Sequence, residues 1–145
     1  MEQLIEIYNQ VNNFGRENNM ILTVIKPGEI IYEMEILEKH LATLTTSHGG
    51  MIAAMMDGVI GVAALSLVAP DKKLVSTVEY KLNYFKPAYL GDKLKGYGRV
   101  DFAGKRIIAT SGEIYNQKGE MIAKAMGTFN AYPFEKSDIA KVKSL

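Results

Sequence analysis

Hydrophobic residues recur along the first third of the chain with two different periods. In residues 2–13 the apolar positions are spaced by three and four residues, which predicts a short amphipathic helix that lies on the surface and ends at the polar run 15–19. Residues 21–25 form a short apolar run and residues 30–37 alternate imperfectly, so each segment predicts a β-strand. Residues 38–48 follow neither period, and we expect a loop there with one helical turn.

The stretch 51–69 is apolar on nearly every side and carries one charge, Asp57. A membrane span is one interpretation of such a segment. An acid near its middle costs about 2.5–3.5 kcal/mol on insertion scales, however, and no basic cluster flanks it. The core helix of a small domain fits the pattern better, and we expect it to begin at Gly49 or Gly50, with no membrane as a partner.

Four segments after this helix have the period of β-strands. They are residues 75–85, 92–102, 105–116 and 120–132. The last three are separated by turns short enough for antiparallel hairpins, and the charged tail from residue 133 is expected to fray. This order of elements favours an α+β domain in which an antiparallel sheet wraps around the apolar helix.

The strand over residues 75–85 has the clearest alternation of apolar and polar positions. Its buried face is expected to hold every second residue, namely Val78, Tyr80, Leu82 and Tyr84. Thr77 falls on the opposite face, beside Glu79, and that face is expected to be polar.

The composition describes a single globular domain over residues 1–145, with a core between about residues 20 and 132 and 48% hydrophobic residues. Seventeen Lys and Arg balance sixteen Asp and Glu to a net charge of +1, which argues against nucleic acid as a partner. The chain has no cysteine and two histidines, so neither a disulfide nor a metal site is expected. The N-terminus lacks the basic region of a secretory signal, and a cytoplasmic location is expected.

The sequence Ser47-His48-Gly49-Gly50 at the start of the apolar helix is the first candidate for chemistry. The first N–H groups of a helix have no partner inside it and carry about half a positive charge, which suits an oxyanion. Glycine leaves the approach to those groups open, so a substrate carbonyl oxygen can lie against them. A structural interpretation stays open as well, with Ser47 as N-cap, the glycines permitting a tight turn and His48 fixing the entrance of the helix.

Asp57 is the second candidate, because a carboxylate on a buried helix needs a compensating partner. It is either a structural acid that holds a loop or a subunit contact, or a nucleophile or general base. Asp57 lies about 12 Å along the helix axis from Gly49, too far to act on the same carbonyl. If both residues act, the acid must come from a second chain, which predicts a homodimer with two antiparallel helices.

Two motifs carry a resemblance to a known family. The first is HGGMIAAMMDG, from His48 to Gly58, and the second is STVEYKLNYFKPA, from Ser76 to Ala88, followed by LGD at residues 90–92. Together they resemble the hotdog-fold acyl-CoA thioesterases, and most of all the PaaI-like branch related to the 4-hydroxybenzoyl-CoA thioesterases. The resemblance covers about residues 20 to 132.

This resemblance implies a hotdog fold, which is an antiparallel sheet around a long central helix, assembled as a dimer or a dimer of dimers with sites between subunits. It implies an acyl-CoA substrate that is hydrolysed without a metal or redox cofactor. The Gly49 N–H would polarise the thioester carbonyl, and Asp57 would activate water or attack as a nucleophile. Thr77 would orient the water or the carboxylate.

The residues expected to bind the substrate are Gly50, His40, Lys86, Lys105 and Arg106. His40 begins the family pattern H-x-N-x-x-G-x-x-H-G-G, in which this chain has Ala42 for the Asn and Thr45 for the Gly. The three basic residues are candidates for the phosphates of CoA. Three methionines of the helix are candidates for the wall of an acyl pocket, namely Met51, Met55 and Met56.

Two other functions stay open. Because Ala42 replaces the family asparagine, a second hypothesis is an acyl-CoA sensor that binds its ligand without turnover. A hotdog hydratase or dehydratase is the third hypothesis, although those enzymes pair a histidine with an acid in another motif. The sequence does not identify the acyl group.

Overall fold

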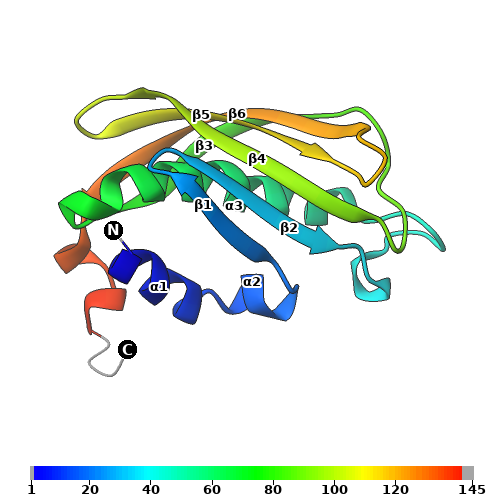
Figure 1. Cartoon of the computed structure of the whole chain (residues 1–145), viewed down its shortest axis with the longest axis horizontal. Helices are drawn as coiled ribbons and strands as arrows, with labels where there is room; N and C mark the ends of the chain where they lie inside the picture. The colour runs from blue at the N-terminus through cyan, green and yellow to red at the C-terminus, as the bar shows by residue number, and fades with distance from the viewer. Residues whose placement is uncertain (1, 142–145) are drawn as a thin grey trace.

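The computed structural model describes residues 2–141 of the 145-residue chain, and it shows one curved sheet around one long helix (Figure 1). The helices are α1 (Glu2–Val11), α2 (Asn13–Glu17) and α3 (Gly49–Val68). The strands are β1 (Ile21–Lys26), β2 (Glu29–Glu35), β3 (Lys73–Tyr84), β4 (Lys93–Ala103), β5 (Ile107–Tyr115) and β6 (Met121–Pro133). Short 3₁₀ helices occupy Glu38–His40, Ala69–Asp71, Phe134–Lys136 and Ile139–Lys141.

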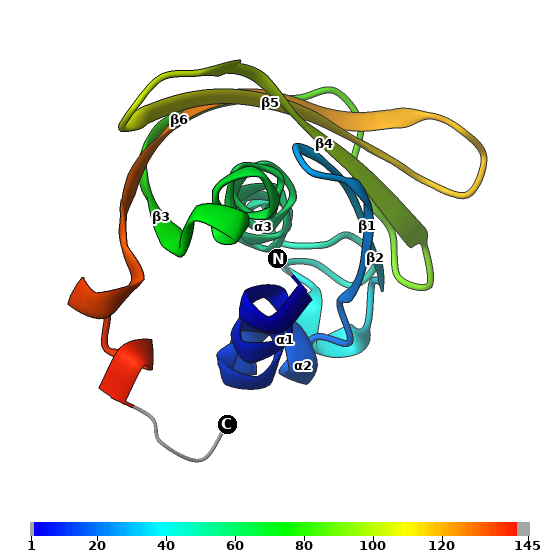
Figure 2. The same ribbon diagram turned by 60° about the vertical axis from the view of Figure 1, so that its left-hand side comes forward.

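The six strands form one antiparallel sheet in the order β1-β2-β4-β5-β6-β3. Figure 2 shows the sheet curving around α3, with α1 and α2 on the side of α3 that the sheet leaves open. The predicted α+β class and hotdog architecture are confirmed, and so are the two hairpins that join β4, β5 and β6. The order leaves β1 and β3 as the edges of the sheet.

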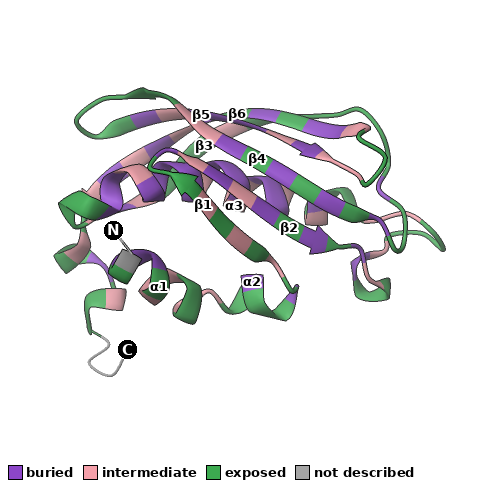
Figure 3. Ribbon diagram, viewed as in Figure 1, coloured by how far each residue is buried: buried purple, intermediate pink, exposed green. Residues whose placement is uncertain are grey.

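α3 supplies the centre of the hydrophobic core. Met55, Met56, Val59 and Ile60 are fully buried, and Figure 3 shows buried positions recurring along the strands that surround this helix. Within residues 2–141, the stretch Gly49–Asp71 is the one long and apolar enough to cross a membrane, and 72% of its most apolar window is buried inside the fold. Its hydropathy is accounted for by this core position.

Glycines in the sheet allow α3 to lie unusually close to the strands. A Cβ built on Gly98 of β4 would lie 2.1 Å from the carbonyl oxygen of Val59, and one on Gly96 would lie 2.5 Å from the Val59 side chain. A Cβ on Gly112 of β5 would meet Ile60 at 2.8 Å. The backbone of α3 therefore packs directly against these three glycines, and a larger residue at any of them would displace the helix.

The expected burial of β3 is wrong in part. Tyr80 and Leu82 do face the core, but Val78 is 56% exposed and Tyr84 is exposed as well. The pairing of β3 with β6 shifts between Thr77 and Glu79, so Val78 is the extra residue of a β-bulge. Because a bulge reverses the alternation of a strand, Thr77 points to the helix side and not to the polar side predicted for it.

The ends of the chain also differ from the expectation. The first helix ends at Val11, and a second helix follows across the polar run, since the Asn12 side chain accepts a hydrogen bond from the Gly15 N–H at 3.1 Å. The tail does not fray directly after Pro133, because Phe134 and Ile139 pack against a small apolar cluster that includes residues of α1. Residues 142–145 of that tail lie outside the described residues.

The close contact between Gly98 and α3 predicts a large loss of stability for Gly98→Ala. The added methyl group would meet backbone of α3, so the free energy of unfolding is expected to fall by about 3 kcal/mol or more, at the upper end for overpacking. Gly58→Ala is the matched control, because its Cβ would lie 3.4 Å from the flexible end of Met20 and alanine favours a helix. Urea denaturation should leave Gly58→Ala within about 1 kcal/mol of the wild type. Equal stability of the two variants would contradict the close contact.

Candidate active site

The N-terminus of α3 leaves the Gly49 backbone N–H for a ligand. His48 is the N-cap, and its Nδ1 accepts a hydrogen bond from the Gly50 N–H at 2.8 Å. The Met51 N–H donates to the His48 carbonyl at 3.0 Å. Among the hydrogen bonds of residues 2–141, none uses the Gly49 N–H. His48, and not Ser47, therefore caps the helix, and the Gly49 amide is the donor that can polarise a carbonyl.

A shallow groove of about 280 Å³ lies over this amide. Gly49, Ile52 and the segment from Tyr84 to Ala88 line it, and the Tyr84 hydroxyl donates to the Gly49 carbonyl at 2.7 Å. The sequence analysis did not single out Tyr84 as a site residue, although it stands in the second family motif. Its hydrogen bond holds the strand end against the first turn of the helix.

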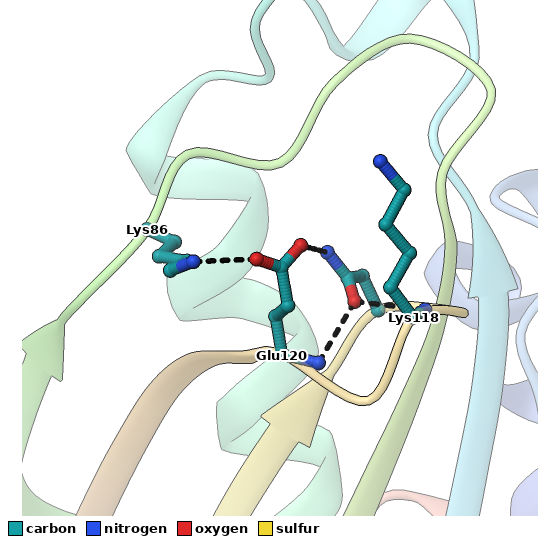
Figure 4. A network of polar contacts seen from close by, with 4 residues as sticks. Lys86, Lys118 and Glu120 are labelled. Atoms are coloured by element: carbon teal, nitrogen blue, oxygen red, sulfur yellow. Dashed lines mark hydrogen bonds and ion pairs between the residues drawn. The ribbon is translucent and has the colours of Figure 1, made fainter.

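Lys86 also lines this groove and is the positively charged residue of its lining. Its Nζ forms an ion pair with Glu120 at 2.5 Å, and Asn116 also donates to the Glu120 carboxylate, at 3.0 Å (Figure 4). The hydrogen bond from Lys86, followed by the one from Asn116, lowers the pKa of Glu120. Of the three basic residues predicted to bind substrate, Lys86 is the one that the fold brings to Gly49.

Lys105 and Arg106 lie at the opposite end of the sheet. Their turn leads into β5 at Ile107, which pairs with Asn130 of β6, which in turn pairs with Ser76 of β3. Gly49 contacts β3 eight residues farther along, which is about 26 Å away. Within one chain these two residues do not reach the Gly49 groove.

Asp57 has the partner that its position on the core helix demands. The Thr77 hydroxyl donates to its Oδ1 at 2.8 Å, across from β3 to α3. This contact exists because the bulge at Val78 turns Thr77 toward the helix. Tyr8 of α1 lines the same cavity as Asp57. Burial raises the pKa of Tyr8, and the charge of Asp57 raises it further. Tyr8 is a site neighbour that sequence reasoning missed, because α1 contacts Asp57 only through the tertiary fold.

Gly49 and Asp57 do not come together within one chain. Both belong to the continuous helix α3, whose geometry separates them by about 12 Å. The half-buried carboxylate and the exposed amide donor therefore lie at two separate places on the same protomer.

His40 is a buried structural residue. Its Nδ1 accepts a hydrogen bond from the Leu37 N–H at 2.9 Å, and its Nε2 lies 2.7 Å from Oδ1 of Asn18, so the ring is neutral with its proton on Nε2. Its carbonyl accepts from the His48 N–H at 2.7 Å. With both ring nitrogens engaged, His40 supports the loop before α3 and does not offer a side chain to the substrate.

Two further predictions concern the methionines of α3 and a metal site. Met55 and Met56 are fully buried in the core and line no cavity near Asp57, whereas Met51 is half-buried. Among the residues that the structure describes, no group of three His, Asp or Glu side chains is close enough to hold a metal ion.

The motifs of the site belong to a known family. The sequence profile of the thioesterase superfamily matches residues 44–123, which include Gly49, Asp57 and Thr77. The chain belongs to the thioesterase superfamily. Its enzyme class is that of the thioester hydrolases, and the resemblance to the hotdog thioesterases is confirmed. The chain is 28% identical over 131 residues to acyl-coenzyme A thioesterase 13 of Homo sapiens, across 88% of this chain and 91% of that relative.

Solved thioesterase-fold structures superpose on this one. The PaaI protein of the phenylacetic acid degradation operon of E. coli gives a TM-score of 0.83 over 90% of this chain and 91% of that chain, at 18% identity. The smu.793 protein of Streptococcus mutans UA159, whose structure is bound to acetyl CoA, gives 0.72 over 79% of this chain and 90% of that chain, at 26% identity.

The surroundings of His40 predict a pH dependence for the stability of this thioesterase. Burial, and then the charge of Lys39, lowers the pKa of His40, so the folded state resists protonation more than the unfolded state does. This contribution is fully present above about pH 6.5 and is lost as the pH falls through the lowered pKa of the folded state. Urea denaturation between pH 7.5 and 5 should show it.

Substitution of each histidine isolates this effect. His40→Gln is expected to lose about 1–3 kcal/mol at pH 7.5 and to show a flatter pH dependence, because a buried donor and acceptor are left poorly paired. His48→Gln, at the exposed and only other histidine, should keep the slope of the wild type. An unchanged slope in His40→Gln would exclude His40 as its source.

Proposed function

We propose that the protein is an acyl-CoA thioesterase, which hydrolyses an acyl-CoA to the free acid and CoA. The observation that carries the proposal is the Asp57 carboxylate held by the Thr77 hydroxyl, on the same helix whose first amide, that of Gly49, is free to bind an oxyanion. The name of the human relative and the acetyl CoA bound to the Streptococcus mutans structure support CoA thioesters as the substrates.

The active site is formed between two protomers. A separation of about 12 Å on one rigid helix prevents Gly49 and Asp57 of one chain from acting on one carbonyl carbon. A second copy, with its α3 antiparallel, supplies an Asp57 to each Gly49 and produces two equivalent sites. β3 favours such an assembly, because it is a twelve-residue edge strand with free backbone groups and the exposed side chain of Val78.

The reaction then follows from the roles of three groups. The Gly49 N–H, with the helix dipole behind it, stabilises the negative charge that develops on the thioester oxygen. Asp57 either takes a proton from the attacking water or attacks the carbonyl carbon itself to form an anhydride that water opens. In both routes a new C–O bond forms, the C–S bond breaks, and CoA leaves as a thiolate that is protonated. Thr77 occupies Oδ1 of Asp57 and leaves Oδ2 for the reaction.

The CoA moiety is expected to lie along the Gly49 groove, where Lys86 is the basic residue that can contact its phosphates. Lys105 and Arg106 can reach this groove only from a second copy, since they lie at the far end of their own sheet. An acyl-CoA sensor needs no acid beside the carbonyl, so the supported carboxylate favours hydrolysis over binding alone.

Replacement of Asp57 and Thr77 tests the proposal. Asp57→Asn is expected to lower kcat for thiol release by about 10²–10⁴, because the base or nucleophile is removed. Thr77→Val is expected to lower it by about 10–10², the worth of a hydrogen bond to a charged group. Both should keep the oligomeric state of the wild type in size-exclusion chromatography.

Asp101→Asn is the matched control, since Asp101 is an exposed carboxylate on β4 whose contact with Arg99 is long, at 3.7 Å. It should keep the wild-type rate within about a factor of two, as expected for a surface ion pair. Thiol release by Asp57→Asn at the rate of Asp101→Asn would reject the assignment. Binding of acyl-CoA by the wild type without any thiol release would favour the sensor.

A further inference from the structure

A second cavity lies directly beside the Asp57 carboxylate. It has a volume of about 240 Å³ and lies between α1, α3, β3 and β6, away from the groove over Gly49. Asp57 and Thr77 stand at one end of it. Along α3 the cavity extends to Leu65, which is eight residues or about 12 Å from Asp57.

The cavity is apolar away from the acid, and packed apolar side chains line its far end. Val62, Leu65, Leu74 and Phe129 are buried side chains of its wall. Leu65 and Leu74 belong to the small cluster that packs α1 against the C-terminal turns, and Ile139 of the last turn packs on the same cluster. Figure 2 shows α1 and these turns on the open side of α3, so the two ends of the chain close what the sheet leaves uncovered.

We propose that this cavity receives the acyl group of the substrate and limits it to one aromatic ring or a chain of up to about nine carbons. The inference rests on the proposed function, because it takes the reacting carbonyl to lie at Asp57. An apolar cavity of about 150 Å³ binds benzene, so 240 Å³ holds a ring with a few further atoms. An extended chain advances by somewhat less than the bond length of about 1.5 Å per carbon, and about 12 Å therefore accepts eight or nine carbons.

Part of the cavity wall comes from segments that lie outside the family profile. Tyr8, Phe129, Tyr132 and Ile139 all line the cavity, and all lie outside residues 44–123. Gly61 allows the Phe129 ring to pack closely against α3, because a Cβ there would lie 3.1 Å from the ring. The catalytic pair therefore belongs to the part of the chain that the family profile covers, whereas α1, the end of β6 and the last turn supply further wall of the acyl pocket.

Ile139→Trp tests the pocket directly. Ile139 is half-buried on the last turn, so a larger side chain there can fill the cavity without displacing the central core. Ile25→Trp is the matched control, because Ile25 is 53% exposed on β1 and lines no part of the cavity. The readout is kcat/KM for thiol release from acetyl-, hexanoyl-, benzoyl-, dodecanoyl- and palmitoyl-CoA.

For the wild type, kcat/KM is expected to be highest with hexanoyl- or benzoyl-CoA and at least tenfold lower with palmitoyl-CoA. Ile139→Trp should lower it at least tenfold for hexanoyl- and benzoyl-CoA and by less than threefold for acetyl-CoA. Ile139→Ala should raise it for dodecanoyl-CoA, and Ile25→Trp should match the wild type throughout. Equal profiles for Ile139→Trp and Ile25→Trp, or palmitoyl-CoA used as well as hexanoyl-CoA, would overturn the proposal.

A second readout separates this proposal from the proposed function. The chain contains no tryptophan, so Tyr132→Trp places a single fluorophore in the cavity wall and Ile25→Trp places one outside it. Hexanoate and benzoate should change the fluorescence of the Tyr132→Trp protein alone, and palmitate should not. If no acyl-CoA is hydrolysed but this pattern appears, the proposed function fails and the pocket stands. If neither acid changes the fluorescence, the pocket proposal fails even with hydrolysis intact.

Discussion

The constraint on which this protein depends is the fixed separation of two groups on one helix. α3 carries a free amide at Gly49 and a carboxylate at Asp57, and a straight helix holds them about 12 Å apart. The helix cannot bend to bring them closer, because its middle packs directly against Gly96, Gly98 and Gly112 of the sheet. A site that uses both groups therefore needs two chains, and the edge strand β3 offers the second chain a place to pair.

The hydrogen bond that holds the Asp57 carboxylate depends on an irregularity in the sheet. A regular β3 would turn Thr77 away from α3, as its alternation with Tyr80 and Leu82 requires. The extra residue at Val78 reverses that direction and places the Thr77 hydroxyl on Asp57 at 2.8 Å. Close helix packing and one bulge thus allow a core helix to carry a half-buried carboxylate whose hydrogen-bond partner comes from the sheet.

Much of this fold follows from periodicity along the sequence. The helix at Gly49 and the strands that begin near residues 93, 107 and 121 were predictable, because amphipathic alternation and turn residues are local signals. The bulge at Val78 was not, since a bulge is selected by the pairing with β6 and leaves no local mark. The second helix, α2, depended on one capping side chain, that of Asn12.

The candidate site was predictable to the same extent. Gly49, Asp57 and Thr77 come from motifs, and the fold brings Thr77 to Asp57 and Lys86 to Gly49. The burial of His40 and the closure of a cavity by the two chain ends depend on contacts between distant segments, which no single stretch of sequence encodes. The motif therefore locates the chemistry, whereas the shape of the substrate pocket emerges only from the tertiary structure.

Complementation between two inactive variants tests the two-chain site most directly. Gly49→Pro removes the amide hydrogen and adds a ring in its place, 3.6 Å from the Tyr84 side chain at Cβ, which is an ordinary contact. The helix should still form, since proline is accepted at the first residue of a helix and His48 already has the extended backbone that precedes it, at φ −61° and ψ 136°. Mixed and refolded with Asp57→Asn, the Gly49→Pro variant should yield hybrid dimers with one intact site and about a quarter of the wild-type thiol release. A mixture no more active than either variant alone would contradict a site shared between protomers.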